Sequence, residues 1–214
     1  MTDDAVDYAS LLCSRLCHDL LSPVGAINNG VELLADEHDP ELRARVLELL
    51  AESARASAAK LKFFRLAFGA AGGFGDAVDT REARAAIEGL FGQDKRVALG
   101  WMVSDPSMGK GAIKILLNLA LIGADALVRG GRLDVGAEGG EIVVRAEGPR
   151  LVLDPELRTA LLGQTAPQAL TPRAAAAWLV HRLATGQGGK VMVSDADEGV
   201  LLLGAHLPDG RNRL

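Results

Sequence analysis

The residues best suited to chemistry in this sequence lie between Leu16 and Val24, in the stretch LCHDLLSPV. An uncharged imidazole, here that of His18, is a good nucleophile near neutral pH. The carboxylate of Asp19 follows directly and is able to hold and orient a proton of the ring. Pro23 lies inside an otherwise helical pattern, where a proline removes a backbone N–H and costs about 3 kcal/mol. A local cost of that size favours a functional site at this turn.

Small and apolar residues surround His18 at alternating steps of three and four, which is the spacing of an a/d heptad seam. We therefore predict one long helix here, with His18 at a b position on its outer face. Ser22, Gly25 and Asn29 share that face, and a histidine beside small residues leaves room for a partner protein. The predicted seam consists of Val6, Ser10, Cys13, Cys17, Leu20, Val24, Ile27, Val31 and Leu34.

A turn at 36–40 separates this helix from a second amphipathic run that extends to Phe68. Asp39 is suited to be the N-cap of the second helix, with Pro40 at its first position. Two long helices joined by a short turn predict an antiparallel hairpin. The hairpin has more apolar residues than one helix pair buries, so we predict that two hairpins form a four-helix bundle in a homodimer. Packing against the second half of the same chain is the alternative. The additional apolar residues are Leu12, Leu16, Leu21 and Leu33.

The glycine-rich stretch 70–75 breaks the helical pattern and divides the chain into two predicted domains, 1–72 and 73–214. Helical and strand periodicities alternate in the second domain. This mixture predicts an α+β chain whose C-terminal half is an α/β sandwich, with helices on one face of a mixed sheet. The expected helices are 80–91, 108–129, 154–162 and 172–185, and the expected strands are 96–103, 131–137, 141–147, 190–194 and 200–207.

Composition limits the classes of protein to which the chain can belong. Of its 214 residues, 49% are hydrophobic and 24% are charged, which is typical of a globular domain and excludes a disordered chain. No uncharged apolar run reaches the roughly 18 residues of a membrane span. The net charge of −5 argues against nucleic acid and anionic lipid as partners. The acidic N-terminus lacks the basic region of a signal peptide, so we predict a cytoplasmic protein.

The hexapeptide His18-Asp19-Leu20-Leu21-Ser22-Pro23 resembles the phosphoacceptor box of sensor histidine kinases. The resemblance includes the heptad hairpin and the α/β half, which is then expected to be histidine-kinase-ATPase-like. It implies that His18 is phosphorylated, with Asp19 as a base. Because adjacent residues on a helix do not face each other, we expect Asp19 to reach His18 sideways, through water or in a geometry that depends on the dimer.

The positions at which that kinase family binds ATP differ in this sequence. Asn118 matches the first asparagine of the nucleotide helix, but Ile122 stands where the metal-binding asparagine belongs. The adenine turn, at 146–150, lacks its aspartate and second glycine, and the segment at the glycine-loop position, 170–176, contains no glycine. The sequence has no other phosphate-binding glycine motif. The resemblance therefore implies a degenerate nucleotide domain with no bound cofactor, and a relay of phosphate in place of kinase chemistry.

The stretch 15–19 with Ser22-Pro23, and the later stretch 65–70, are similar to the ChpT family of alphaproteobacterial histidine phosphotransferases. Members of that family are homodimers that pass phosphoryl groups between receiver domains without ATP. The resemblance implies a donor receiver on a CckA-like hybrid kinase, and CtrA-like and CpdR-like response regulators of the cell cycle as acceptors. Mg²⁺ is expected on the receiver and not on this chain. The residues expected to contact the receiver are Arg15, Ser22, Gly25, Ala26 and Asn29, together with residues of the second helix near Leu50 and Ala54.

Three other functions stay open at this point. A divergent ATP-dependent kinase is supported only by Asn118, and a non-catalytic scaffold that binds a response regulator needs no active histidine. A phosphatase acting on receivers would use Ser22. A metal site on Cys13, Cys17 and His18 is disfavoured, because soft metals usually have more ligands, so no metal is expected.

Overall fold

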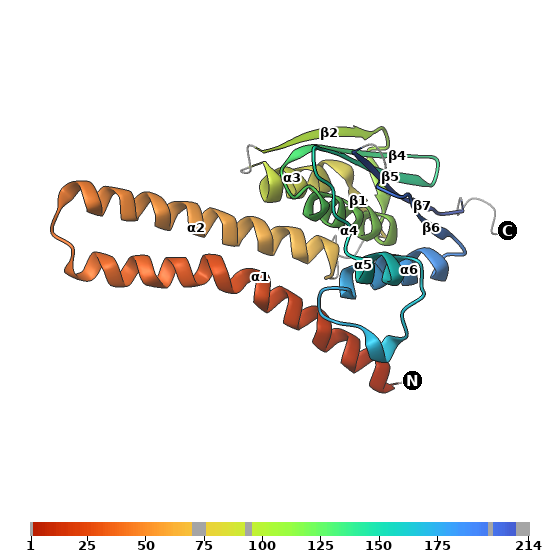
Figure 1. Ribbon diagram of the computed structural model, residues 1–214, viewed down its shortest axis with the longest axis horizontal. Helices are drawn as coiled ribbons and strands as arrows, with labels where there is room; N and C mark the ends of the chain where they lie inside the picture. The colour runs from red at the N-terminus through yellow and green to blue at the C-terminus, as the bar shows by residue number, and fades with distance from the viewer. Residues whose placement is uncertain (1, 70–75, 93–95, 197–198, 209–214) are drawn as a thin grey trace.

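The computed structural model describes residues 2–69, 76–92, 96–196 and 199–208. It consists of a helical hairpin followed by an α/β half, in which helices cover one face of a sheet (Figure 1). The predicted α+β fold is therefore confirmed. The predicted linker at 70–75 lies outside the described residues, so the domain boundary between residues 72 and 73 stays a prediction.

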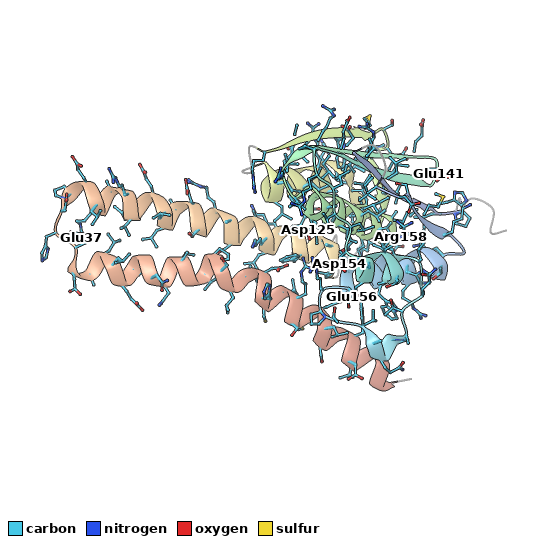
Figure 2. The ribbon with its side chains drawn as sticks, in the orientation of Figure 1. Glu37, Asp125, Glu141, Asp154, Glu156 and Arg158 are labelled. Atoms are coloured by element: carbon cyan, nitrogen blue, oxygen red, sulfur yellow. The ribbon has the colours of Figure 1, made fainter. Side chains whose placement is uncertain are left out.

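The hairpin is formed by α1 (Thr2–Asp36) and α2 (Pro40–Ala67), which run side by side in opposite directions (Figure 1). Asp39 is the N-cap of α2, as predicted, and its carboxylate accepts a hydrogen bond of 2.9 Å from the backbone N–H of Glu41. Glu37, labelled at the tip of the hairpin in Figure 2, accepts hydrogen bonds of 2.8 Å from two backbone N–H groups of the turn. These side chains fix the reversal of the chain.

The predicted heptad seam of α1 faces two different environments. Toward α2, the helices approach closely at Gly30, where an added Cβ would lie 2.7 Å from a methyl carbon of Leu50. The buried or half-buried residues along this side are Leu20, Pro23, Ile27, Gly30 and Leu34. The rest of the predicted seam is exposed within one chain, at Val6, Ser10, Cys13, Cys17, Val24 and Val31. Only part of the predicted seam therefore contacts α2.

α1 changes direction about midway, and its N-terminal part lies against the C-terminal half (Figure 1). The Tyr8 hydroxyl donates a 2.9 Å hydrogen bond to the carbonyl of Ala175, and its ring centroid lies 4.6 Å from that of Trp178. Burial raises the pKa of the Tyr8 phenol. Leu16 packs against a core that the end of α2 shares with the C-terminal half, so packing within one chain accounts for this leucine, whereas Leu21 is 74% exposed.

The sheet of the C-terminal half is mixed, as predicted. In the described part of the chain it has five strands in the order β2-β4-β5-β7-β6. β2 and β4 are parallel, and the other neighbours are antiparallel. A separate antiparallel pair, β1 (Ala77–Asp79) and β3 (Ser107–Gly109), was not predicted. The strands of the main sheet are β2 (Val97–Val103), β4 (Gly131–Glu138), β5 (Glu141–Glu147), β6 (Lys190–Val193) and β7 (Val200–His206).

Helices pack on one face of this sheet (Figure 1). The alternation of buried and exposed residues in β5 confirms that only one face belongs to the core. α4 is almost wholly buried because it contacts the sheet, α2 and α6. It begins later than predicted, since 107–109 form β3. The helices are α3 (Thr80–Phe91), α4 (Lys110–Ala126), α5 (Pro155–Leu161), α6 (Ala175–Gly186) and the 3-10 turn η1 (Pro167–Ala169).

No helix in the described ranges is both long enough and apolar enough to cross a membrane.

Candidate functional site

His18 projects from α1 into solvent, with 87% of its side chain exposed. Its Nδ1 lies 3.2 Å from Oδ1 of Asp19. The contact is sideways along the helix but direct, so the expectation that water or a dimer would be needed is wrong. A carboxylate beside Nδ1 stabilises a proton on that nitrogen, which leaves the lone pair of Nε2 free. The arrangement presents a nucleophilic nitrogen at the protein surface.

Arg15 holds Asp19 from the other side. Its Nε donates a 2.7 Å hydrogen bond to Oδ2 of Asp19, and its guanidinium lies 3.5 Å from the carboxylate of Asp125. The Arg15 side chain is only 16% exposed. A chain of charged groups thus runs from Asp125 through Arg15 and Asp19 to His18. This position makes Arg15 an orienting group for Asp19, and its predicted contact with a receiver domain stays a prediction.

Asp125, labelled in Figure 2, lies near the end of α4, where α4 approaches α1. Burial raises the pKa of its carboxyl, the positive charge of Arg15 acts in the opposite direction, and the negative charge of Asp19 raises the pKa further. Half of the Asp125 side chain still reaches solvent, which limits the energetic effect. The C-terminal half therefore contributes a charged group to the surroundings of His18.

A cleft of about 590 Å³ opens beside His18. One wall is α1, and the opposite wall is the segment 171–173, at the position where the glycine-rich loop of kinases is expected. Thr171 donates a hydrogen bond of 2.5 Å to Glu156, and Arg173 forms a 3.1 Å ion pair with Asp154. Asp154 and Glu156, both labelled in Figure 2, are themselves linked, because the backbone N–H of Glu156 donates a 2.9 Å hydrogen bond to Oδ1 of Asp154. The segment is thus held by side-chain contacts near the imidazole.

The other predicted contact residues of α1 continue along the helix from His18. Ser22, Ala26 and Asn29 are exposed, and a Cβ added at Gly25 would meet no atom within 4 Å. Gly25 is therefore not required for packing inside this chain, and the structure leaves open space there. The role of these residues in partner binding stays a prediction.

The predicted contact residues of α2 differ from each other. Ala54 is exposed. Leu50, in contrast, is half-buried and lies against Gly30 of α1, and contact of this part of α2 with a partner stays a prediction.

Asn118, the residue that resembles a nucleotide ligand, is fully buried. Its Nδ2 donates hydrogen bonds to the carbonyls of Ala67, at 3.1 Å, and Lys114, at 2.8 Å. Its Oδ1 has no hydrogen-bond partner among the described residues. Asn118 thereby ties the end of α2 to α4, which is a structural role that its spacing in the sequence did not indicate.

Sequence reasoning missed Asp125 and Lys60, whose ammonium contacts the backbone of α1. Neither has a local spacing signal, because each reaches the site from another helix. Within the described ranges, His, Cys, Asp and Glu side chains do not gather in groups of three or more suited to a metal ion.

Comparisons with known proteins address the family and the fold of the chain. Residues 80–199 match the family model of the histidine phosphotransferase C-terminal domain. The protein phosphotransferase ChpT of Brucella abortus (strain 2308) is 43% identical over 138 residues, which are 64% of this chain and span 64% of the Brucella protein. A solved bacterial phosphotransferase is 33% identical and superposes with a TM-score of 0.83, covering 94% of this chain and 97% of that chain.

Proposed function

The chain belongs to the histidine phosphotransferase family, and from that premise we propose that it relays phosphoryl groups between receiver-domain aspartates through His18. The observation that supports this most directly is the exposed imidazole, whose Nδ1 contacts Asp19 and whose Nε2 is free to act as a nucleophile. In this proposal the protein is a phosphotransferase of a two-component phosphorelay, with phosphohistidine as its intermediate.

In the first step, the lone pair of Nε2 attacks the phosphorus of an aspartyl phosphate on the donor receiver. A P–N bond forms, the P–O bond breaks, and the aspartate carboxylate of the receiver leaves with the electron pair. Asp19 keeps the proton at Nδ1 and stabilises the positive charge that develops on the ring. In the second step an aspartate of the acceptor receiver attacks the phosphohistidine. This chain supplies position and charge, while Mg²⁺ is expected on the receiver.

The receiver is proposed to dock on the part of α1 that follows His18 in the sequence. The contact residues there are Ser22, Gly25, Ala26 and Asn29. The open space at Gly25 supports this surface. We expect Gly25→Leu to leave the thermal stability nearly unchanged and to slow phosphotransfer at least about tenfold, because the added side chain occupies the docking face. If Gly25→Leu lowered the thermal stability as well as the transfer rate, the slowing would follow from unfolding, and the assignment of the docking face would be contradicted. Gly30→Leu is the contrasting variant, since it disturbs Leu50 and destabilises the hairpin itself.

The finer identity of the partners rests on the similarity to ChpT of Brucella abortus. The proposed donor is the receiver of a CckA-like hybrid kinase, and the proposed acceptors are CtrA-like and CpdR-like response regulators of a cell-cycle relay in the cytoplasm. Transfer rates measured with each purified receiver test which receiver is the donor and which are the acceptors.

A homodimer is proposed because the hairpin leaves apolar side chains uncovered. Leu21, Val24 and Val31 of α1 are between 52% and 74% exposed. A second hairpin would cover such a surface and complete a four-helix bundle. Sedimentation at increasing protein concentration tests the proposal, and a chain that stays monomeric at all concentrations would contradict it.

Relay without ATP is proposed because the kinase-like positions serve packing. Asn118 bonds to Ala67, and the segment 171–173 is fixed by Glu156 and Asp154. Calorimetry with ATP and Mg²⁺ is expected to give no heat of binding. Micromolar affinity would instead support a divergent kinase.

The test of the relay itself is transfer from a receiver carrying a ³²P-labelled aspartyl phosphate. Label is expected on the wild type and on the control His38→Gln, whose histidine is exposed in the turn, and not on His18→Gln. Label on His18→Gln, or none on the wild type, would reject the proposal. Rapid loss of label from the receiver without any phosphohistidine would point to the phosphatase function of Ser22.

A further inference from the structure

Pro23 leaves one backbone acceptor of α1 without its helical donor. In an α-helix the N–H of each residue donates to the carbonyl four residues earlier, and proline has no N–H. The carbonyl concerned is that of Asp19. α1 nevertheless continues as a helix through Pro23 to Asp36.

The missing donor is replaced from the other helix of the hairpin. Nζ of Lys60, a half-buried residue of α2, donates a 2.6 Å hydrogen bond to the carbonyl oxygen of Asp19. Hydrogen bonds from charged donors are stronger than neutral ones, and an unpaired carbonyl away from water is unfavourable. Lys60 therefore joins α2 to the turn of α1 that carries His18.

We propose that Lys60 is a positioning residue for phosphotransfer: its ammonium replaces the N–H absent at Pro23 and thereby fixes Asp19 and the imidazole that Asp19 contacts. The inference rests on the proposed role of His18 and adds a residue of α2 to it. Asp19 is then held at its carbonyl by Lys60 and at Oδ2 by Arg15, while Oδ1 contacts His18. With two of its oxygens fixed, the third has a defined direction toward the ring.

The first experiment measures the rate of phosphotransfer from a phosphorylated receiver to Lys60 variants. Lys60→Met removes the donor and keeps a long apolar side chain, and we expect a loss of about tenfold. Lys60→Arg retains a charged donor and is expected to restore most of the rate. Lys62→Met is the matched control, because Lys62 is an exposed lysine of the same helix, and its rate is expected to equal that of the wild type. Equal rates for the Lys60→Met and Lys62→Met proteins would overturn the proposal.

The second experiment tests the link to Pro23. Pro23→Ala returns an N–H to the carbonyl of Asp19, so Lys60→Met is expected to change the rate less than about twofold in the Pro23→Ala background. A loss of the same size in both backgrounds would overturn the proposal. The double variant also supplies the helical hydrogen bond by itself, so the comparison holds even if Lys60→Met alone folds poorly.

The third measurement separates this inference from the proposed function. The ¹⁵N shifts of the His18 ring are expected to change in Lys60→Met and to stay unchanged in Lys62→Met, because the Nδ1 contact with Asp19 loosens only in the former. Unchanged shifts in both variants would overturn the positioning role. If the wild type accepts no phosphate, the relay fails, while these shifts still decide whether Lys60 positions the ring.

Discussion

The hairpin and the α/β half place their apolar residues in opposite ways. In the α/β half, Leu116, Leu133 and Leu203 are fully buried between α4 and the sheet. In the hairpin, Leu21 and Val31 are 74% and 57% exposed. The α/β half therefore has a core of its own, whereas the hairpin has an apolar face that no residue in the described ranges covers. The difference indicates that the two halves derive their stability from different sources.

The polar groups of the two halves also differ in exposure. His18 is exposed on the hairpin, and its contacts with Asp19 and Arg15 orient it without covering it. Asn118 in the α/β half is fully buried and bonds to backbone carbonyls. A kinase-like sequence pattern thus coincides with an exposed imidazole in one half and with a buried packing group in the other.

Matched leucine substitutions give the largest expected effect in this comparison. We expect Leu116→Ala to lower the free energy of unfolding by about 3 kcal/mol, because the side chain is fully buried and leaves a cavity. Leu21→Ala is expected to change the stability of a single chain by less than about 0.5 kcal/mol. In the proposed homodimer the second copy covers Leu21, so any further loss is expected to depend on protein concentration. Urea titrations at several protein concentrations measure the unfolding free energy of both variants. A large loss in Leu21→Ala that does not depend on protein concentration would contradict the comparison.

Asn118→Ala tests the packing role of the buried amide. The substitution removes the hydrogen bond to Ala67, so we expect a loss of about 2 kcal/mol in unfolding free energy. Phosphotransfer by the fraction that remains folded is expected to stay near the wild-type rate. Thermal unfolding and transfer assays provide the two readouts. Unchanged stability together with altered nucleotide binding would restore the kinase interpretation.

Asp125→Asn gives the smallest expected effect and concerns the junction of the two halves. The pKa of Asp125 is raised in the folded chain, first by burial, so the folded state retains this proton to a higher pH than the unfolded state does. Its contribution to stability is full below the usual Asp range, near pH 4, and declines as the pH rises through the raised pKa. We expect the wild type to lose up to about 1 kcal/mol relative to Asp125→Asn over this range, since the group is half exposed. If the unfolding free energies of the wild type and Asp125→Asn changed with pH in parallel, the raised pKa of Asp125 would be contradicted.

Local patterns in the sequence were sufficient to predict most elements. The period of three and four predicted both helices of the hairpin, the Asp-Pro pair located the start of α2, and α3 and β5 have the predicted bounds. The pair β1 and β3 was missed because each strand is short and finds its partner far away in the sequence. The excess of apolar residues in the hairpin was foreseen, but periodicity did not indicate which residues of the α1 seam would face α2 and which would stay exposed.

The candidate site was predictable only in part. His18 and Asp19 are adjacent, so the motif identified them, although their direct contact depends on the rotamers that Arg15 supports. Asp125 and Lys60 come from α4 and α2, and only the packing of the helices brings them to α1. The approach of Leu50 to Gly30 was not predicted either, because Gly30 is on another helix.

Cys13 and Cys17 lie one turn apart on the uncovered side of α1, and both thiols are free and exposed. These two thiols are native sites for chemical labelling of that surface, so no cysteine has to be introduced there. Their rates of alkylation, followed by mass spectrometry as the protein is diluted, would report directly when this side of the helix becomes accessible. The same exposure means that purified material needs a reductant, because oxidative cross-links between copies would otherwise imitate genuine association.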